Sequence, residues 1–219
     1  MSNTVFTWLA RAFVLFTAMP IHESAHGFMA ARLGDDTPKK QGRLTLNPLV
    51  HLDLLGSFLL IFAGFGWAKP VQVDARNFKH PKRDMALTAL AGPLSNVLMG
   101  MLILILYKLF LNFFHLWPYL RYHTSSLEII NSILSTMLVT NIYLAVFNLI
   151  PIPPLDGSKI LGALLPERYY FGFMRYERYM ILVLIVLLFF DKLSAPIAFL
   201  ASYLIQLLDI LTAILGRIF

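Results

Sequence analysis

The chain has 219 residues, of which 58% are hydrophobic and 14% are charged, with a net charge of +6 at pH 7. Soluble domains carry about 25% charged residues, so this composition excludes an ordinary soluble fold and predicts one polytopic membrane domain over residues 1–219. The absence of cysteine excludes disulfides and thiolate metal sites, which leaves histidine and carboxylates as metal ligands. Basic residues gather in short loops, as expected for loops beside anionic lipid, and no nucleic-acid partner is predicted.

The first predicted element is a long apolar helix over residues 5–33. At about 1.5 Å per residue, a helix of this length can cross a lipid bilayer. Pro20 lies inside it and is expected either to kink the helix or to start a second helical segment.

The same helix contains an HExxH sequence, His22-Glu23-Ser24-Ala25-His26. Residues i and i+4 lie one turn apart on one helical face, so His22 and His26 can bind one metal ion. Glu23 can act as a general base toward a water molecule. Three ionisable groups in one turn at membrane depth are costly without a function. We therefore favour a metal site over a purely structural role for these side chains.

A polar region with short alternating runs follows the first helix. Alternation at residues 43–46 and again at 69–73 predicts two strands that can pair. Residues 52–67 are apolar but short and interrupted by glycines, which favours a re-entrant segment over a full crossing. Together these segments predict a small re-entrant β-hairpin element near the cytoplasmic face.

Four further apolar segments are predicted to be helices, at residues 84–114, 127–149, 178–190 and 195–214. With the first helix and the re-entrant segment, they predict an all-α polytopic membrane protein of about five to six transmembrane helices. Residues 1–165 contain all the motifs and form the predicted core. Residues 166–219 contribute two generic apolar helices.

A catalytic zinc site has three protein ligands and one open position, so HExxH needs a third ligand. Asp156 is the best candidate, because it ends an apolar span just after the proline-rich residues 151–154, where the backbone cannot continue as a helix. Gly157 permits a sharp turn after it. Asp156 could alternatively be a turn or N-cap residue. His51 and Asp53 are rival ligands, although a turn or interfacial role fits their short segment better.

Three motifs, in their order, resemble the site-2 protease family of intramembrane zinc metalloproteases. They are HExxH, Ala91-Gly92-Pro93-Leu94-Ser95-Asn96, and the segment from Asn148 to Asp156-Gly157. Residues 42–48 and 66–71 resemble the compact prokaryotic branch, which lacks a PDZ domain. The resemblance implies that His22, His26 and Asp156 bind one Zn²⁺ per chain and that Glu23 is the catalytic acid/base.

Two amide side chains in apolar spans, those of Asn96 and Asn148, allow two interpretations. Such amides commonly form hydrogen bonds between membrane helices. The resemblance instead suggests that Asn96 or Asn148 binds the substrate peptide or stabilises the oxyanion of the tetrahedral intermediate.

The resemblance implies an intramembrane protease that cleaves within or near the membrane span of single-span protein substrates, as in regulated intramembrane proteolysis. Its expected location is the plasma or inner membrane, with the active site nearer the cytoplasmic face. An unwound substrate segment could add as a strand to the predicted hairpin. The alternative is a metal transporter or an inactive membrane scaffold with the same ligands. The sequence shows no inverted repeat, and a transporter has no need of a base beside its first ligand.

Overall fold

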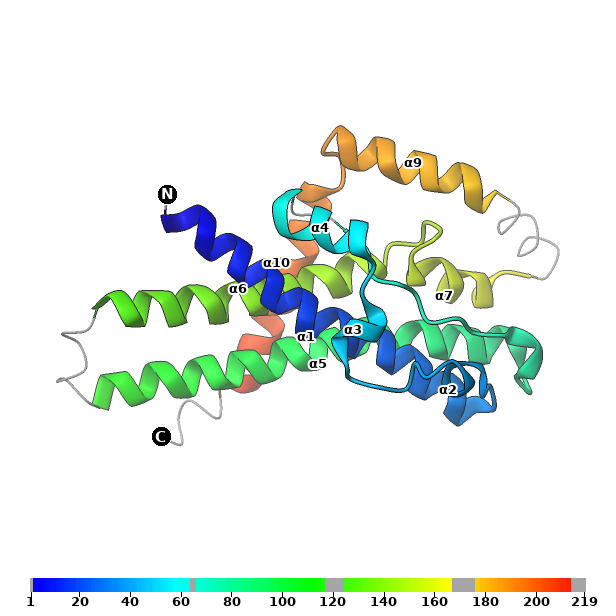
Figure 1. Ribbon diagram of the computed structural model, residues 1–219, viewed down its shortest axis with the longest axis horizontal. Helices are drawn as coiled ribbons and strands as arrows, with labels where there is room; N and C mark the ends of the chain where they lie inside the picture. The colour runs from blue at the N-terminus through cyan, green and yellow to red at the C-terminus, as the bar shows by residue number, and fades with distance from the viewer. Residues whose placement is uncertain (1, 64–65, 117–123, 167–175, 214–219) are drawn as a thin grey trace.

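The computed structural model describes residues 2–63, 66–116, 124–166 and 176–213, and these are mostly helical (Figure 1). The helices are α1 (Ser2–Leu33), α2 (Thr37–Lys40), α3 (Pro48–His51), α4 (Leu54–Ala63), the 3-10 helix η1 (Ala75–Asn77), α5 (Pro81–Leu116), α6 (Thr124–Asn148), α7 (Asp156–Leu164), α9 (Glu177–Phe189) and α10 (Ser194–Thr212). The expected helical class is therefore confirmed.

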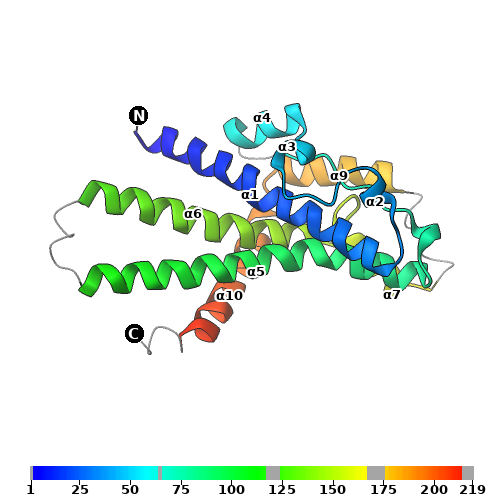
Figure 2. The same ribbon diagram turned by 60° about the horizontal axis from the view of Figure 1, so that its bottom comes forward.

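Helix α5 is the centre of the bundle. It packs against α1, α6 and α7, while α10 packs across α6 and α5. Figures 1 and 2 show α5 and α6 side by side, with α1 along them and α10 crossing behind. The buried core lies where α5, α6 and α10 meet and includes Ile103, Ile142 and Ala201. This core fixes α5, against which α1 and α7 pack.

Three of the described helices are long and apolar enough to cross a membrane, over Pro81–Asn112, Glu128–Asn148 and Ser194–Thr212. They correspond to three predicted spans. The helix at Tyr179–Phe189 is apolar but shorter. Large apolar side chains on the outside of α5, such as Leu98 and Leu102, are about half exposed, as expected for a lipid-facing surface. The expected count of five to six spans is not confirmed.

The predicted strands at residues 43–46 and 69–73 do not form, and the described residues contain only an isolated antiparallel bridge between Leu52 and Ala68. The cause lies in where the backbone groups are bonded. The Thr45 carbonyl accepts from the Ser24 hydroxyl (2.5 Å), and the Val71 N–H donates to Glu23 (2.9 Å). These segments therefore bond to α1 rather than to each other, although their alternation resembled that of strands.

The expected re-entrant segment is a short helix with a close return. α4 is 10 residues long, about half of what a full crossing needs. A Cβ atom at Gly56 would lie 2.2 Å from the Trp67 carbonyl oxygen, and one at Gly66 would lie 2.0 Å from that of Gly56. Only glycines allow the chain after α4 to approach it this closely. Residues 64–65, within the predicted segment, lie outside the described part.

Helix α1 is continuous from Ser2 to Leu33, with Pro20 buried inside it, so no second segment starts at Pro20. After it ends, Asp35 joins α1 to the chain around η1. Its carboxylate is fully buried and accepts hydrogen bonds from the backbone N–H and hydroxyl of Thr37, the backbone N–H of Asp74 and the amide of Asn77. Burial by itself raises the pKa of Asp35, but the bonds from these three residues lower the pKa more, so the net shift is downward.

We expect Asp35→Asn to lower the free energy of unfolding at neutral pH by about 1–3 kcal/mol, because a buried charged acceptor is lost. The folded-state pKa of Asp35 is below its unfolded value. Its stabilisation is therefore complete above the unfolded pKa, about 3.9, and is lost as pH falls through the folded value. Thermal unfolding at neutral and acidic pH should show the difference from wild type shrinking in acid.

The matched control is Asp36→Asn, because the neighbouring Asp36 is exposed and its side chain makes no capping hydrogen bond. Equal stability losses for the two variants would contradict the role of Asp35.

Candidate metal centre

The side chains of His22, His26 and Asp156 meet between α1, α5 and α7, all three buried. The two Nε2 atoms lie 3.0 Å apart, and each lies 3.2 Å from Asp156 Oδ2. The two histidines come from one turn of α1, as the i, i+4 spacing predicts. The aspartate comes from the first residue of α7, 130 positions further along the chain than His26.

These three atoms fit a zinc ion. Ligands about 2.0–2.1 Å from a tetrahedral zinc lie about 3.3 Å from one another, close to the observed separations. A carboxylate and the unprotonated nitrogens of two imidazoles are all acceptors, and a cation between them removes their mutual repulsion. Two histidines and one carboxylate are also a ligand set of catalytic zinc sites, which keep a fourth position open.

The outer nitrogens of both imidazoles are bonded to α5. His22 Nδ1 donates to Asn96 Oδ1 (2.8 Å), and His26 Nδ1 donates to the Thr88 carbonyl oxygen (2.7 Å). With the proton on Nδ1, each Nε2 presents its lone pair to the centre. Asn96 is itself held by Asn141 of α6, whose Oδ1 lies 3.4 Å from Asn96 Nδ2. A chain of buried amides therefore orients His22.

Gly92 brings α5 against the two histidines. A Cβ atom there would lie 2.4 Å from Nε2 and Cε1 of His26 and 2.7 Å from Cε1 of His22. Thr88, Gly92 and Asn96 recur every four residues and so lie on one face of α5. That face supplies, in order, a carbonyl acceptor, space for the imidazoles and an amide acceptor.

The proline-rich segment positions Asp156. The Leu155 N–H donates to the Ile152 carbonyl (3.0 Å), and α7 begins at the next residue. A Cβ atom at Gly157 would lie 2.2 Å from the Leu149 carbonyl oxygen. Gly157 thus allows the end of α6 to lie against the start of α7. The sequence predicted only that Gly157 permits a sharp turn, whereas this contact leaves no room for a side chain. The second carboxylate oxygen of Asp156 lies 3.7 Å from Lys159 Nζ.

Glu23 lies on a different face of α1 from the two histidines and is half-buried. Its Oε2 accepts a hydrogen bond from the Val71 N–H (2.9 Å). The extended segment around Val71 therefore runs directly past the predicted general base, and its backbone sets where the carboxylate points.

The rival ligands lie elsewhere. His51 is fully buried, with Nε2 2.8 Å from the Thr45 carbonyl oxygen, and Asp53 accepts from the Gly56 N–H (2.8 Å) at the start of α4. Neither belongs to the described group of possible metal ligands. Asn148, predicted with Asn96 to bind substrate, donates to the Leu144 carbonyl of its own helix (3.0 Å).

Three partners of the site, Asn141, Thr88 and Val71, were not predicted from the sequence. Asn141 could have been predicted, because it is an amide in an apolar span, as Asn96 and Asn148 are. Thr88 and Val71 act through backbone atoms, which no side-chain pattern reveals.

The chain is similar to known metalloproteases. Residues 119–190 match Peptidase family M50. "Putative zinc metalloprotease YwhC" of Bacillus subtilis (strain 168) is 38% identical over 180 residues, which cover 79% of this chain and 77% of that protein. The chain belongs to the site-2 protease family, peptidase family M50. No solved structure matches it.

Two further relatives are more distant from this member of the M50 family. "Zinc metalloprotease MJ0392" of Methanocaldococcus jannaschii is 27% identical over 77% of this chain and 38% of its own length. "Putative zinc metalloprotease Rip2" of Mycolicibacterium smegmatis is 33% identical over 67% of this chain and 52% of its own length. The M50 match at residues 119–190 includes Asp156 but not HExxH, so the two halves of the metal centre meet only in the fold.

We expect Gly92→Ala to weaken zinc binding, because a methyl group at this position overlaps both imidazole rings. Zinc retained after dialysis against a chelator measures the effect. Gly100→Ala is a suitable control, since a Cβ there meets the tip of the flexible Ile142 side chain, 2.7 Å away. Equal zinc retention by the two variants would contradict the proposed fit between α5 and the histidines.

We expect Asn96→Leu to lower zinc affinity by about 10–100-fold, since the outer partner that fixes the His22 tautomer is lost. Competition with a chromophoric chelator measures the affinity, and thermal unfolding checks that the variant is folded. Asn131→Leu removes an exposed amide of α6 and should leave affinity unchanged. Wild-type affinity in Asn96→Leu would show that the amide does not position the ligand.

Proposed function

We propose that this chain is an intramembrane zinc metalloprotease that hydrolyses peptide bonds within or near the membrane spans of single-span proteins. One observation carries the proposal. The ligand atoms of two imidazoles and a carboxylate lie within 4.8 Å of one another. Glu23 directly follows the first of these histidines, His22, in α1. Membership of the site-2 protease family and the metalloprotease names of the relatives support it.

In the proposed mechanism, His22, His26 and Asp156 would hold the metal. Bound zinc supplies a Lewis acid that acidifies water and polarises the scissile carbonyl. Glu23 accepts a proton from the attacking water and later donates it to the leaving amine. The Val71 N–H donates to one Glu23 oxygen, Oε2, so the proposed proton transfer is assigned to the other oxygen.

Substrate access is proposed along residues 69–72. A peptide bond inside a helix is shielded by its own helical hydrogen bonds, so a substrate must unwind locally before it is cut. Residues 69–72 form no ladder with another described segment. The N–H groups of Lys69 and Val71 are already bonded, to the His51 carbonyl and to Glu23, so an unwound peptide is proposed to pair with the carbonyl groups and the Gln72 N–H of this segment. Asn148 remains a proposed contact for the substrate.

We further propose that residues 1–219 act as one domain in the plasma or inner membrane, with α1 as an additional span. Basic residues cluster around the end of α1 and the start of α5, at positions 32–43 and 76–83. By the positive-inside rule both clusters face the cytoplasm, which puts the metal centre nearer that side. The transporter and scaffold alternatives are not favoured, because neither uses a general base at Glu23.

We expect Glu23→Gln to abolish most proteolysis while leaving zinc bound, with cleavage of a model single-span substrate falling at least about 100-fold. Glutamine keeps the shape of the side chain and an oxygen that can accept from Val71, but it is not a base. Zinc content per chain should remain at the wild-type level. Purified protein in detergent or nanodiscs, assayed with and without chelator, gives both measurements.

The companion variants are Asp156→Asn, His22→Ala and His26→Ala, which should lose both zinc and activity because each removes a ligand. Full zinc and turnover in Asp156→Asn would place the third ligand elsewhere. Undiminished cleavage by Glu23→Gln would overturn the assigned role of the base.

A further inference from the structure

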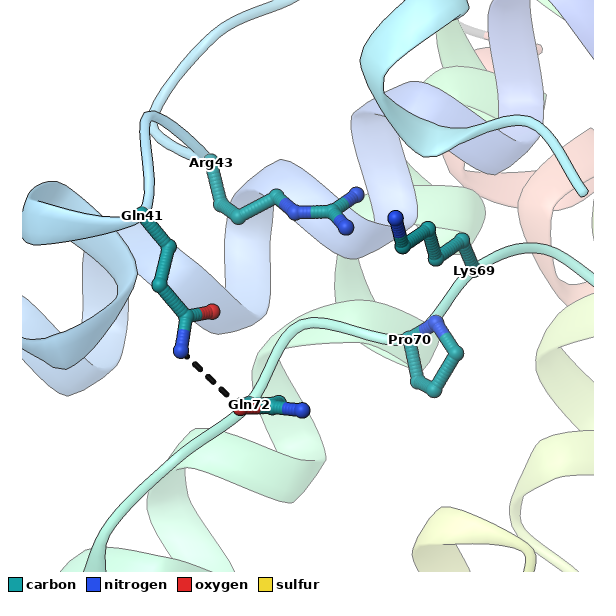
Figure 3. Close-up of a pocket in the computed structure, with 5 residues that line it drawn as sticks. All are labelled: Gln41, Arg43, Lys69, Pro70 and Gln72. Carbon is teal, nitrogen blue, oxygen red and sulfur yellow. Dashed lines mark hydrogen bonds between the residues drawn. The ribbon is translucent and has the colours of Figure 1, made fainter.

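A pocket of about 400 Å³ lies between the loop after α2 and the extended segment that leads to η1 (Figure 3). It is lined by Gln41, Arg43, Lys69, Pro70 and Gln72. The amide of Gln41 donates to Gln72 Oε1 (2.9 Å) and joins the two walls. Its volume lies within the range of small ligand sites, about 300–1,000 Å³. The lining includes two cations and no acid.

Arg43 is the unusual member of this pocket, because it is only 8% exposed and forms no ion pair with a carboxylate of the described residues. One arm of its guanidinium donates to the Val50 carbonyl, which fixes the group in place. A guanidinium has five N–H donors, so this bond leaves others free for a ligand. Figure 3 shows the guanidinium and the Lys69 ammonium pointing toward each other. Among the described residues, neither is part of an ion pair.

Two cations that face each other across a pocket repel, and an anion between them removes the repulsion. Arginine binds a carboxylate with two parallel hydrogen bonds, and lysine adds a point charge. Gln41 and Gln72 are exposed and offer further polar groups at the rim. The chemistry of the pocket therefore selects an anionic group of about the size of a carboxylate.

The pocket shares a wall with the catalytic site. Val71 donates to Glu23, and its side chain is turned toward α1, where a Cβ at Gly27 would lie 3.7 Å from it. Its neighbours Pro70 and Gln72 line the pocket instead. A peptide extended along this segment advances about 3.3 Å per residue. A substrate residue a few positions from the scissile bond therefore reaches the two cations.

We propose that this pocket is a specificity subsite that binds the carboxylate of an aspartate or glutamate in the substrate, a few residues from the bond that is cut. The inference rests on the proposed protease function and adds a substrate class to it. A peptide carboxylate fits better than a lipid headgroup, because one wall of the pocket is the segment that contacts Glu23.

The test is a series of single-span substrates that are neutral near the cleavage site except for one glutamate, moved one position at a time. In one register, kcat/KM should exceed that of the glutamine-matched substrate by about 10-fold, as one charge-assisted contact of about 1.4 kcal/mol gives. Lys69→Gln should weaken this preference, because only Arg43 remains to bind the carboxylate. Lys69→Glu should abolish it, because the introduced carboxylate can pair with Arg43.

The control variant is Lys79→Gln, which removes an exposed lysine outside the pocket and should keep the preference for glutamate. Arg43 is buried and its loss can unfold the loop, so the exposed Lys69 is the residue to vary. Binding of the same peptides to the Glu23→Gln variant gives a readout that does not require turnover.

Cleavage of all substrates at equal rates would overturn this subsite and leave the protease function intact. Failure of the wild type to cleave any substrate would count against the protease function, whereas selective binding of the glutamate peptide would still support the subsite. A rate that follows the anionic lipid content of the bilayer, and not the glutamate, would assign the pocket to a lipid headgroup and refute the proposal.

Discussion

Two imidazoles and a carboxylate, all facing one another inside a helical bundle, form the constraint on which the surrounding structure depends. Three acceptors so close together are unfavourable unless a cation lies among them, and a buried unpaired carboxylate is among the most costly groups a protein can hold. The surrounding helices are arranged to make the cation site fit. Asn96 and Thr88 fix the protons on the far side of each ring, and Gly92 leaves room for both rings.

The polar side chains of α1 impose a second constraint, because lipid tails cannot form hydrogen bonds with Ser24 or Glu23. The loops around α2, α3 and η1 solve it by covering that face with backbone groups. Ser24 bonds to the Thr45 carbonyl and Glu23 to the Val71 N–H. Since these backbone atoms are bonded to side chains of α1, they are unavailable to a sheet. The same two hydrogen bonds thus satisfy the polar side chains of α1 and explain why the predicted strands do not form.

The sequence was sufficient for the parts of the site that depend on local spacing. His22 and His26 lie one turn apart in any helix. Their proximity can therefore be predicted from the 3.6-residue period without knowing which helix packs against α1. Asp156 could be singled out because an acid after three prolines at the end of an apolar span has few structural uses. The strands failed because alternation reports which face a side chain occupies, and not what its backbone bonds to. Thr88 contributes its carbonyl group, which any residue at that position has. Val71 contributes its N–H, which any residue except proline has.

The close approach at Gly92 also limits how the molecule can open. With α5 backbone against both rings, and ligands from α1 and α7 meeting at one point, these three helices are cross-linked into a rigid frame. A rotation or slide of α1 along α5 would drive the rings into the backbone or pull Nδ1 from its partners. Any movement that admits a substrate would therefore lie outside this frame, for example at α4, which packs mainly against α1.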